Sequence, residues 1–345
     1  MNRKYYGVLT AFFLLVLACS KKDQSAPAPK TIKFTQPSNF PQVVYNFSGN
    51  PLTEEGFELG KKLFYDGILS ANGTVSCATC HIQKDGFAQK GQAVSTGINN
   101  QRTLRNSPAV QNMAFYPDFF WDGRVTHLDK QPEGPITNPV EMGEKLEQVV
   151  SKLKAHNEYP ALFKKAFGEK EITSDLMSKA LSQFMVMLVS GNSKYDRVLR
   201  KEGETFTNEE QMGYETFKLK CANCHAEPLF TDHSFRDIGL RPDIRDEGRY
   251  NVTGNAGDKN KFKVPGLRNA ELTAPYMHNG SVISLFSVMV QYDQQTHNTA
   301  NLDSSMKKNG QLGIRLNNEE KQNLVAFIKT LTDTSFISNK KFAKP

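Results

Sequence analysis

The chain has 345 residues, of which 43 are basic and 36 acidic, giving a formal charge of +7. This length allows two domains, each with a hydrophobic core of its own. The basic excess could indicate nucleic-acid binding, but the sequence contains neither a block of Lys and Arg nor a recognition motif. The charge instead indicates a partly basic surface that could meet an acidic redox partner.

The first 18 residues are typical of an export signal, because basic residues precede an apolar run too short to span a bilayer. The run Val16-Leu17-Ala18-Cys19 resembles a bacterial lipobox, which predicts cleavage before Cys19 and a lipid on its thiol. An ordinary signal peptide with an incidental Cys is the alternative. Residues 19–48 are then expected to form a flexible tether. We expect an exported protein on the periplasmic side of a bacterial membrane.

Apolar residues recur at helical spacing in five segments, which predicts a mainly α fold. Thr53 and Ser174 are expected to cap two of these helices, and Thr207 opens a capping box for another. Asn317 or Asn318 is expected to begin the last helix. The clearest apolar positions are Phe57, Leu59, Leu63, Phe64, Leu146, Val149, Val150, Leu153, Leu176, Ala180, Leu181, Phe184, Leu188, Leu324, Phe327, Ile328 and Leu331.

Long loops rich in Gly, Pro and Asn separate the helices, and loops of this length are uncommon unless they carry function. A charged stretch containing Gly203 suggests a domain boundary. We therefore predict an N-terminal domain over residues 49–203 and a C-terminal domain over residues 204–340. Each would consist of a helix, a Cys-containing motif and a long loop. The loops cover residues 85–112, 115–143 and 236–266.

Two copies of Cys-x-x-Cys-His occur, Cys77-Ala-Thr-Cys80-His81 and Cys221-Ala-Asn-Cys224-His225. This pattern is typical of c-type haem attachment, since both thiols can bond vinyl groups and the His can bind the iron. A zinc site is less consistent with two widely separated pairs that each end in His. A thioredoxin-like pair would need a βαβ context, and structural disulfides remain open in an exported protein. The motifs predict two cytochrome c-like domains with one covalently bound haem each.

The segments around these motifs resemble the bacterial di-haem cytochrome c peroxidases and their MauG-type relatives. The resemblance covers nearly all of residues 50–335. In the N-terminal half it is carried by Arg105-Asn106-Ser107-Pro108, Phe120-Trp121-Asp122-Gly123-Arg124, Leu128-Asp129-Lys130-Gln131 and Pro135-Ile136-Thr137-Asn138-Pro139-Val140-Glu141-Met142. In the C-terminal half it is carried by Lys263-Val264-Pro265-Gly266-Leu267-Arg268-Asn269 and Leu272-Thr273-Ala274-Pro275-Tyr276-Met277-His278-Asn279-Gly280.

The resemblance implies that peroxide reacts at the N-terminal haem. It makes Glu141 the acid–base group of O–O cleavage and places Gln131 beside it. Taken alone, Glu141 would be interpreted as a carboxylate at the start of a helix. The resemblance also places Trp121, the only Trp, between the haems to assist electron transfer, although a lone Trp is usually a packing residue. Arg268 is expected to pair with a haem propionate.

Asn106, Thr273 and Pro275 match the inter-domain calcium site of the family. The ligands would be the Asn106 side chain and backbone carbonyl oxygens, completed by water. The alternative is that Asn106 and Thr273 are ordinary turn residues.

The chain departs from the standard peroxidases at both irons. Ile98 stands where many members have a second His ligand, so we expect an N-terminal iron that is open on one side. Tyr292 stands where the standard peroxidases have an axial Met and MauG-type proteins have Tyr. Met289 is the rival ligand and Met277 a weaker one. A Tyr ligand would lower the potential of the second haem relative to Met.

These features predict reduction of hydrogen peroxide to water, with electrons from a small cytochrome c or cupredoxin entering at the C-terminal haem. A MauG-like enzyme that uses peroxide-derived oxidising equivalents to modify a partner protein is the alternative, which Ile98 and Tyr292 favour. A di-haem electron carrier without enzymatic activity is a third possibility. Glu141 and Gln131 argue against it. A homodimer is compatible with the sequence.

Overall fold

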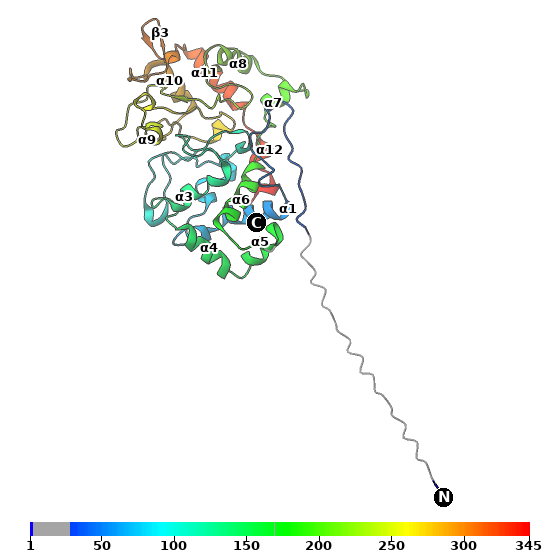
Figure 1. Ribbon diagram of the computed structural model, residues 1–345. Helices are drawn as coiled ribbons and strands as arrows, with labels where there is room; N and C mark the ends of the chain where they lie inside the picture. Colours follow the sequence, from blue (N-terminus) through cyan, green and yellow to red (C-terminus); the bar gives the residue numbers. More distant parts are fainter. Residues whose placement is uncertain (3–27, 169) are drawn as a thin grey trace.

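The computed structural model describes residues 1–2, 28–168 and 170–345 of the chain. Cys19 and residues 3–18 of the expected signal peptide lie outside the described residues, so export and lipid attachment stay predictions. Among the helices that the structure describes, none has the length and apolar character needed to cross a membrane. The chain folds into two mainly helical lobes that pack against each other (Figure 1).

The N-terminal lobe is built around α1, which packs against α5 and α6. Its core is rich in aromatic rings, and short 3-10 turns connect the helices through the long loops. The helices of this lobe are α1 (Glu54–Tyr65), α2 (Cys77–Cys80), α3 (Glu133–Thr137), α4 (Leu146–Ala155), α5 (Tyr159–Phe167) and α6 (Ser174–Val186).

The C-terminal lobe is built around the packing of α8 on α11, and α10 also contacts α11. Two short antiparallel pairs, β1 with β2 and β3 with β4, are the only sheets in the described part of the chain. The elements of this lobe are α7 (Lys194–Leu199), α8 (Asn208–Lys220), β1 (Phe235–Arg236), α9 (Tyr250–Thr253), β2 (Phe262–Lys263), α10 (Leu285–Gln294), β3 (Lys307–Lys308), β4 (Gln311–Leu312) and α11 (Asn318–Lys329). The chain then continues into α12 (Thr334–Ile337), which packs against the N-terminal lobe.

The mainly α prediction is confirmed, and most of the expected helix starts are correct. The Thr53 hydroxyl accepts a hydrogen bond from the backbone N–H of Gly56, and Thr207 forms its capping box. Asn317 caps α11. The prediction for Ser174 is wrong by one position, because Thr173 is the cap and Ser174 already has helical geometry. The short helix α12, which follows α11, was not expected.

Both lobes bring two helices into contact through a glycine. A Cβ atom at Gly60 of α1 would lie 1.9 Å from the carbonyl oxygen of Ala180 in α6. A Cβ atom at Gly213 of α8 would likewise lie 1.9 Å from the carbonyl oxygen of Asn323 in α11. Only glycine permits such an approach of two backbones. The same contact thus occurs once in each lobe.

One helical turn beyond each glycine, a pair of Phe rings continues this correspondence. Phe64 and Phe184 have ring centroids 5.1 Å apart in the N-terminal lobe, and Phe217 and Phe327 have the same separation in the C-terminal lobe. These spacings are typical of favourable aromatic contacts. The two lobes therefore correspond in the packing of their helices as well as in their Cys-x-x-Cys-His motifs, as expected for two domains of one architecture.

The two hydrophobic cores interleave along the chain near the predicted domain boundary. Tyr195 of α7 precedes that boundary, yet it packs in the core of the C-terminal lobe. Phe336 and Phe342 follow α11, yet they pack in the core of the N-terminal lobe. The ends of the two domains are therefore intertwined, and the division at residues 203 and 204 stays a prediction.

Candidate active site

Both motif histidines are oriented by the backbone in the same way. The Nδ1 atom of His81 lies 3.1 Å from the carbonyl oxygen of Phe87, and that of His225 lies 3.0 Å from the carbonyl oxygen of Phe230. A carbonyl oxygen can only accept, so each Nδ1 must carry the proton. Each Nε2 then has a free lone pair, the arrangement found in metal-ligating imidazoles.

Burial keeps these imidazoles neutral, which metal binding requires. It lowers the pKa of His81 to about 4, and the pKa of His225 is shifted in the same direction for the same reason. The four motif cysteines are free thiols. The donor set at each motif therefore fits a covalently attached haem with an axial His.

A cavity of about 300 Å³ adjoins the second motif. Cys221, Cys224 and His225 border it, and Met289 and Tyr292 of α10 also line it. Apolar residues such as Phe119, Val264, Leu267 and Leu285 make up much of the wall, which suits a porphyrin. Met277, the weaker candidate, lines the cavity as well, so the site offers attachment, a proximal ligand and all three candidate axial ligands.

The surroundings of Met289 and Tyr292 differ. Met289 is buried in the second core with Leu285 and Leu316. Tyr292 lies outside that cluster of buried apolar residues. Burial raises the pKa of the Tyr292 hydroxyl, and the nearby Cys221 and Cys224 thiols add to this effect. A phenolate there needs a compensating cation, which a ferric iron would supply. The ligand identity stays a prediction that favours Tyr292.

We expect mass spectrometry of the mature, denatured protein to show two covalently bound haems, one on each Cys-x-x-Cys-His motif. Thioether bonds survive unfolding, whereas a haem held only by axial ligands is lost. A double substitution Cys221→Ala and Cys224→Ala should leave one haem on the peptide that contains Cys77. Fewer than two haems on fully matured wild-type protein would contradict the assignment.

Glu141 lies in the N-terminal lobe, close enough to Cys80 to act on its thiol electrostatically. Its carboxylate accepts a hydrogen bond of 2.8 Å from the side-chain amide of Asn138. Burial raises the pKa of Glu141 above its ordinary value of 4.5, although the Asn138 amide and the Arg124 charge oppose the shift. A carboxyl with a raised pKa beside a cofactor site is suited to proton transfer.

The loop that follows the first motif packs directly on the Glu141 segment. The backbone N–H of Ile98 donates to the carbonyl oxygen of Glu141 at 2.8 Å, and Ile98 is buried. A Cβ atom at Gly97 would lie 2.4 Å from the same carbonyl, and one at Gly143 would lie 2.3 Å from the Ile98 side chain. Ile98, which cannot bind iron, therefore lies beside Glu141.

Asn138 and Arg124 belong to the quoted motifs, but sequence reasoning gave neither a role. The Arg124 guanidinium stacks on the Phe120 ring, with its carbon 3.7 Å from the ring centroid. Its electrostatic effect on Glu141 could not be predicted from the sequence, because it depends on how two loops meet. Gln131 is half-buried at the end of a short 3-10 helix, and its position beside Glu141 stays a prediction.

Trp121 connects the two lobes. Its indole N–H donates to the carbonyl oxygen of Asn106 at 2.9 Å. The backbone N–H of Lys263, in the C-terminal half, donates to the carbonyl oxygen of Trp121 at 2.7 Å. Trp121 also borders the cavity of the second motif. A residue of the N-terminal lobe thus borders the cavity at the second motif.

The three residues of the expected calcium site border the same cavity as Trp121. The side-chain amide of Asn106 donates to the carbonyl oxygens of Gln92 and Ala93, both at 3.1 Å, which orients its oxygen. Thr273 and Pro275 lie in the loop before α10. Calcium binding by Asn106, Thr273 and Pro275 stays a prediction.

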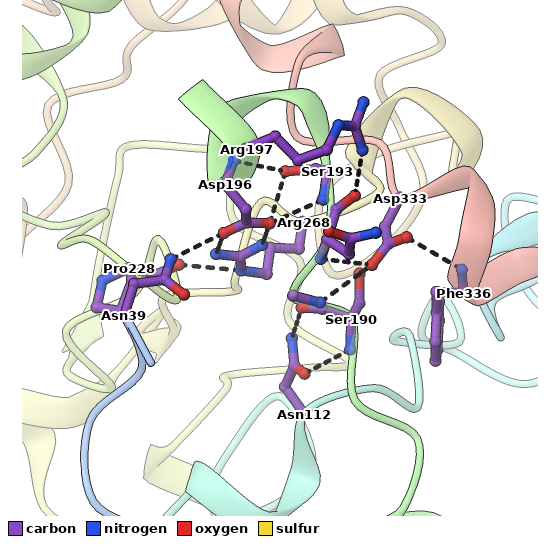
Figure 2. Close-up of polar contacts among 12 residues, drawn as sticks. Asn39, Asn112, Ser190, Ser193, Asp196, Arg197, Pro228, Arg268, Asp333 and Phe336 are labelled. Atoms are coloured by element: carbon purple, nitrogen blue, oxygen red, sulfur yellow. Dashed lines mark hydrogen bonds and ion pairs between the residues drawn. The ribbon is translucent and has the colours of Figure 1, made fainter. Parts of the chain in front are cut away.

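Arg268 has a protein partner that sequence reasoning missed. Its two terminal nitrogens donate to the two carboxylate oxygens of Asp196, at 2.7 and 2.8 Å, and its Nε donates to the carbonyl oxygen of Pro228 (Figure 2). Asn39 and Ser193 also donate to Asp196. The expected propionate contact would therefore involve a guanidinium already held by a buried carboxylate, and it stays a prediction.

Comparison with known proteins extends the similarity over both lobes. A family model for di-haem cytochrome c peroxidases matches residues 54–204. The methylamine utilization protein MauG of Methylorubrum extorquens is 34% identical over 330 residues, covering 94% of this chain and 90% of that protein. The cytochrome c551 peroxidase of Nitrosomonas europaea is 36% identical over 284 residues, 80% of this chain and 79% of the relative. A crystal structure of a MauG-like protein associated with microbial copper homeostasis matches with a TM-score of 0.81 and 31% identity, covering 91% and 99% of the two chains.

Proposed function

Because the chain belongs to the family of di-haem cytochrome c peroxidases and MauG proteins, we propose that it reduces hydrogen peroxide to water. The reaction consumes one peroxide, two protons and two electrons and forms two water molecules. The observation that carries this proposal is Glu141, a carboxyl with a raised pKa that lies beside the first haem motif.

Glu141 acts as the proton carrier of this reaction. As a carboxylate it takes the proton from one peroxide oxygen, and as a carboxylic acid it delivers that proton to the departing oxygen. Asn138 holds one carboxylate oxygen and so fixes the orientation of the group. Ile98 leaves the adjacent face apolar, without a side chain that could close it by ligation. Gln131 is proposed to orient the peroxide.

A haem held by Cys77, Cys80 and His81 would supply the iron that binds peroxide and exchanges electrons. Electrons from a small redox protein are proposed to enter on the C-terminal side, at the second motif. Trp121 supports this route, because it belongs to the N-terminal lobe and borders the cavity at the second motif. The protein is proposed to work outside the cytoplasm, anchored through a lipid on Cys19.

Steady-state peroxide turnover tests the proposal. Mature protein supplied with a reduced cytochrome c or cupredoxin should consume peroxide, with two donor molecules oxidised for each peroxide. Without a donor, consumption should stop once the protein's own electrons are used. Sustained peroxide consumption over many turnovers without any donor oxidation would overturn this function.

The MauG-like alternative is favoured by Ile98 and Tyr292. An open first iron and a Tyr ligand at the second would allow both haems to hold oxidising equivalents for use on a partner protein. A peroxide-dependent covalent change in a co-purifying protein, with donor oxidation absent, would support the alternative.

We expect an electron paramagnetic resonance spectrum of the oxidised protein to contain one high-spin and one low-spin haem. Ile98 occupies the position of a second ligand and cannot bind iron, so the N-terminal haem should remain five-coordinate. The protein should react with peroxide without prior reduction. Two low-spin signals, with reactivity only after addition of one electron, would contradict this expectation.

The substitution Tyr292→Phe is expected to change the low-spin haem spectrum strongly, whereas Met289→Leu should change it little. Phe removes only the hydroxyl that would bind iron, and Leu replaces the Met289 thioether with a core residue of similar volume. Optical and paramagnetic resonance spectra of both variants make the comparison. The reverse pattern would assign Met289 as the ligand.

A further inference from the structure

Arg105 makes three ion-pair contacts with two buried carboxylates, and two of these contacts connect the N-terminal lobe to the C-terminal lobe. Its Nη1 donates to Asp122 at 2.6 Å, while its Nε and Nη2 donate to the two carboxylate oxygens of Asp246 at 2.6 and 2.7 Å. The side chains of Asp122 and Asp246 are only 5% and 8% exposed. Bidentate, charge-assisted contacts of this kind fix orientation as well as distance.

The two carboxylates come from distant parts of the chain. Asp122 directly follows Trp121, and Asp246 lies in the long loop of the C-terminal lobe, where it also accepts from the backbone N–H of Gly248. Arg249 of the same loop donates to the carbonyl oxygen of Asp122 at 3.0 Å. The loop that carries Trp121 is therefore attached to the C-terminal lobe through two arginines.

Arg105 and the next residue, Asn106, both contact the segment that contains Trp121. The carbonyl oxygen of Asn106 accepts from the indole N–H, while the guanidinium of Arg105 binds the carboxylate that follows Trp121. Two consecutive residues thus hold the Trp121 indole and the side chain of the residue that follows it. Trp121 borders the same cavity as Cys221 and Cys224.

The geometry points to Arg105 as a positioning residue that holds Trp121 against the second cofactor site. This role rests on the proposed function of Trp121 as the electron bridge. Lys would preserve the positive charge of Arg105. Its ammonium group, however, cannot reproduce the three hydrogen bonds that the planar guanidinium makes with two carboxylates. Substitution of Arg105 by Lys should therefore allow Trp121 to move, while the positive charge beside Asp122 and Asp246 is retained.

The test uses Arg105→Lys in the mature di-haem protein, where Trp121 is the only tryptophan. Release of the indole from the cavity wall should increase its fluorescence, which haem quenches at short range, and shift the emission to longer wavelength. Electron transfer between the haems should slow several-fold, because the rate of electron tunnelling falls exponentially as the indole moves away from the second cofactor site. Arg245→Lys is the matched control, because Arg245 lies next to Asp246 in the C-terminal loop and pairs with the more exposed Asp243.

A double variant separates positioning from general damage. In a Trp121→Phe background, Arg105→Lys should cause no further loss of electron-transfer rate, because the two changes act through one group. An equal loss in both backgrounds, or wild-type emission from Arg105→Lys, would overturn the inference. If Trp121→Phe alone transfers electrons at the wild-type rate, the bridge function fails, while the emission still decides the positioning. If Arg105→Lys does not retain both haems, Asp246→Asn is measured with the same expected emission.

Discussion

Replacing Glu141 with Gln is expected to slow the first reaction with peroxide by about 10²–10⁴-fold, or roughly 3–5 kcal/mol of activation free energy. The amide has nearly the shape of the carboxyl and can keep a hydrogen bond with Asn138, so both haems and the fold should be retained. Only the capacity to take and return a proton is lost. Stopped-flow mixing with peroxide measures this step directly, before electron delivery can mask it.

Glu144→Gln provides the matched control for this variant. Glu144 lies one residue beyond Gly143 in the same loop and pairs with Lys152 at 2.9 Å. Its substitution removes the same charge without touching the proposed proton path, and the first step should keep its rate. A near-wild-type rate for Glu141→Gln would mean that another group or a water molecule moves the proton.

The pH dependence of the first step gives an independent check on Glu141. Burial raises the pKa of this carboxyl above 4.5, so the carboxylate form is lost at a higher pH than for an exposed Glu. Because only the carboxylate can take the first proton, the rate should fall as the pH falls through this raised pKa. This fall of the rate at low pH should be absent in Glu141→Gln.

Features that depend on short stretches of sequence could be predicted. The spacing of Cys77, Cys80 and His81 identifies a haem motif because attachment and ligation use neighbouring residues on one turn. The caps of Thr53 and Thr207 depend only on residues two or three positions ahead. Thr173 and Ser174 are both good caps, so the sequence alone could not decide which of the two was used.

Features that depend on how distant segments meet could not be predicted. Arg105 and Asp246 are 141 residues apart, and nothing in either local sequence specifies the partner. The same holds for Arg268, whose carboxylate partner Asp196 is 72 residues away. The resemblance indicated that Arg268 matters, but it suggested a cofactor contact rather than this ion pair. Phe336 was missed because its core lies in the other lobe.

We expect the ion pair between Asp196 and Arg268 to be the main stabilising contact between α7 and the loop that carries Arg268. The Asp196 side chain is fully buried and that of Arg268 is 2% exposed. Asp196→Asn leaves the guanidinium charge buried without a counter-charge, which typically costs about 3–5 kcal/mol of unfolding free energy. That is a large part of the roughly 5–15 kcal/mol that stabilises an ordinary domain. Denaturant unfolding of the mature protein, followed by circular dichroism, measures the loss.

Two further measurements show whether the unpaired charge causes the loss. The double variant Asp196→Asn with Arg268→Gln removes both charges and should be more stable than Asp196→Asn alone. Burial by itself would raise the pKa of Asp196, but the Arg268 guanidinium lowers it below its ordinary 3.8. The pair therefore contributes its full stabilisation at pH values above the ordinary pKa of 3.8. This contribution is lost as the pH falls through the lowered pKa of Asp196 in the folded protein. The difference in unfolding free energy between wild type and Asp196→Asn should therefore become smaller in acid. A difference that does not change with pH would show that the lost hydrogen bonds, rather than the charge, account for the effect.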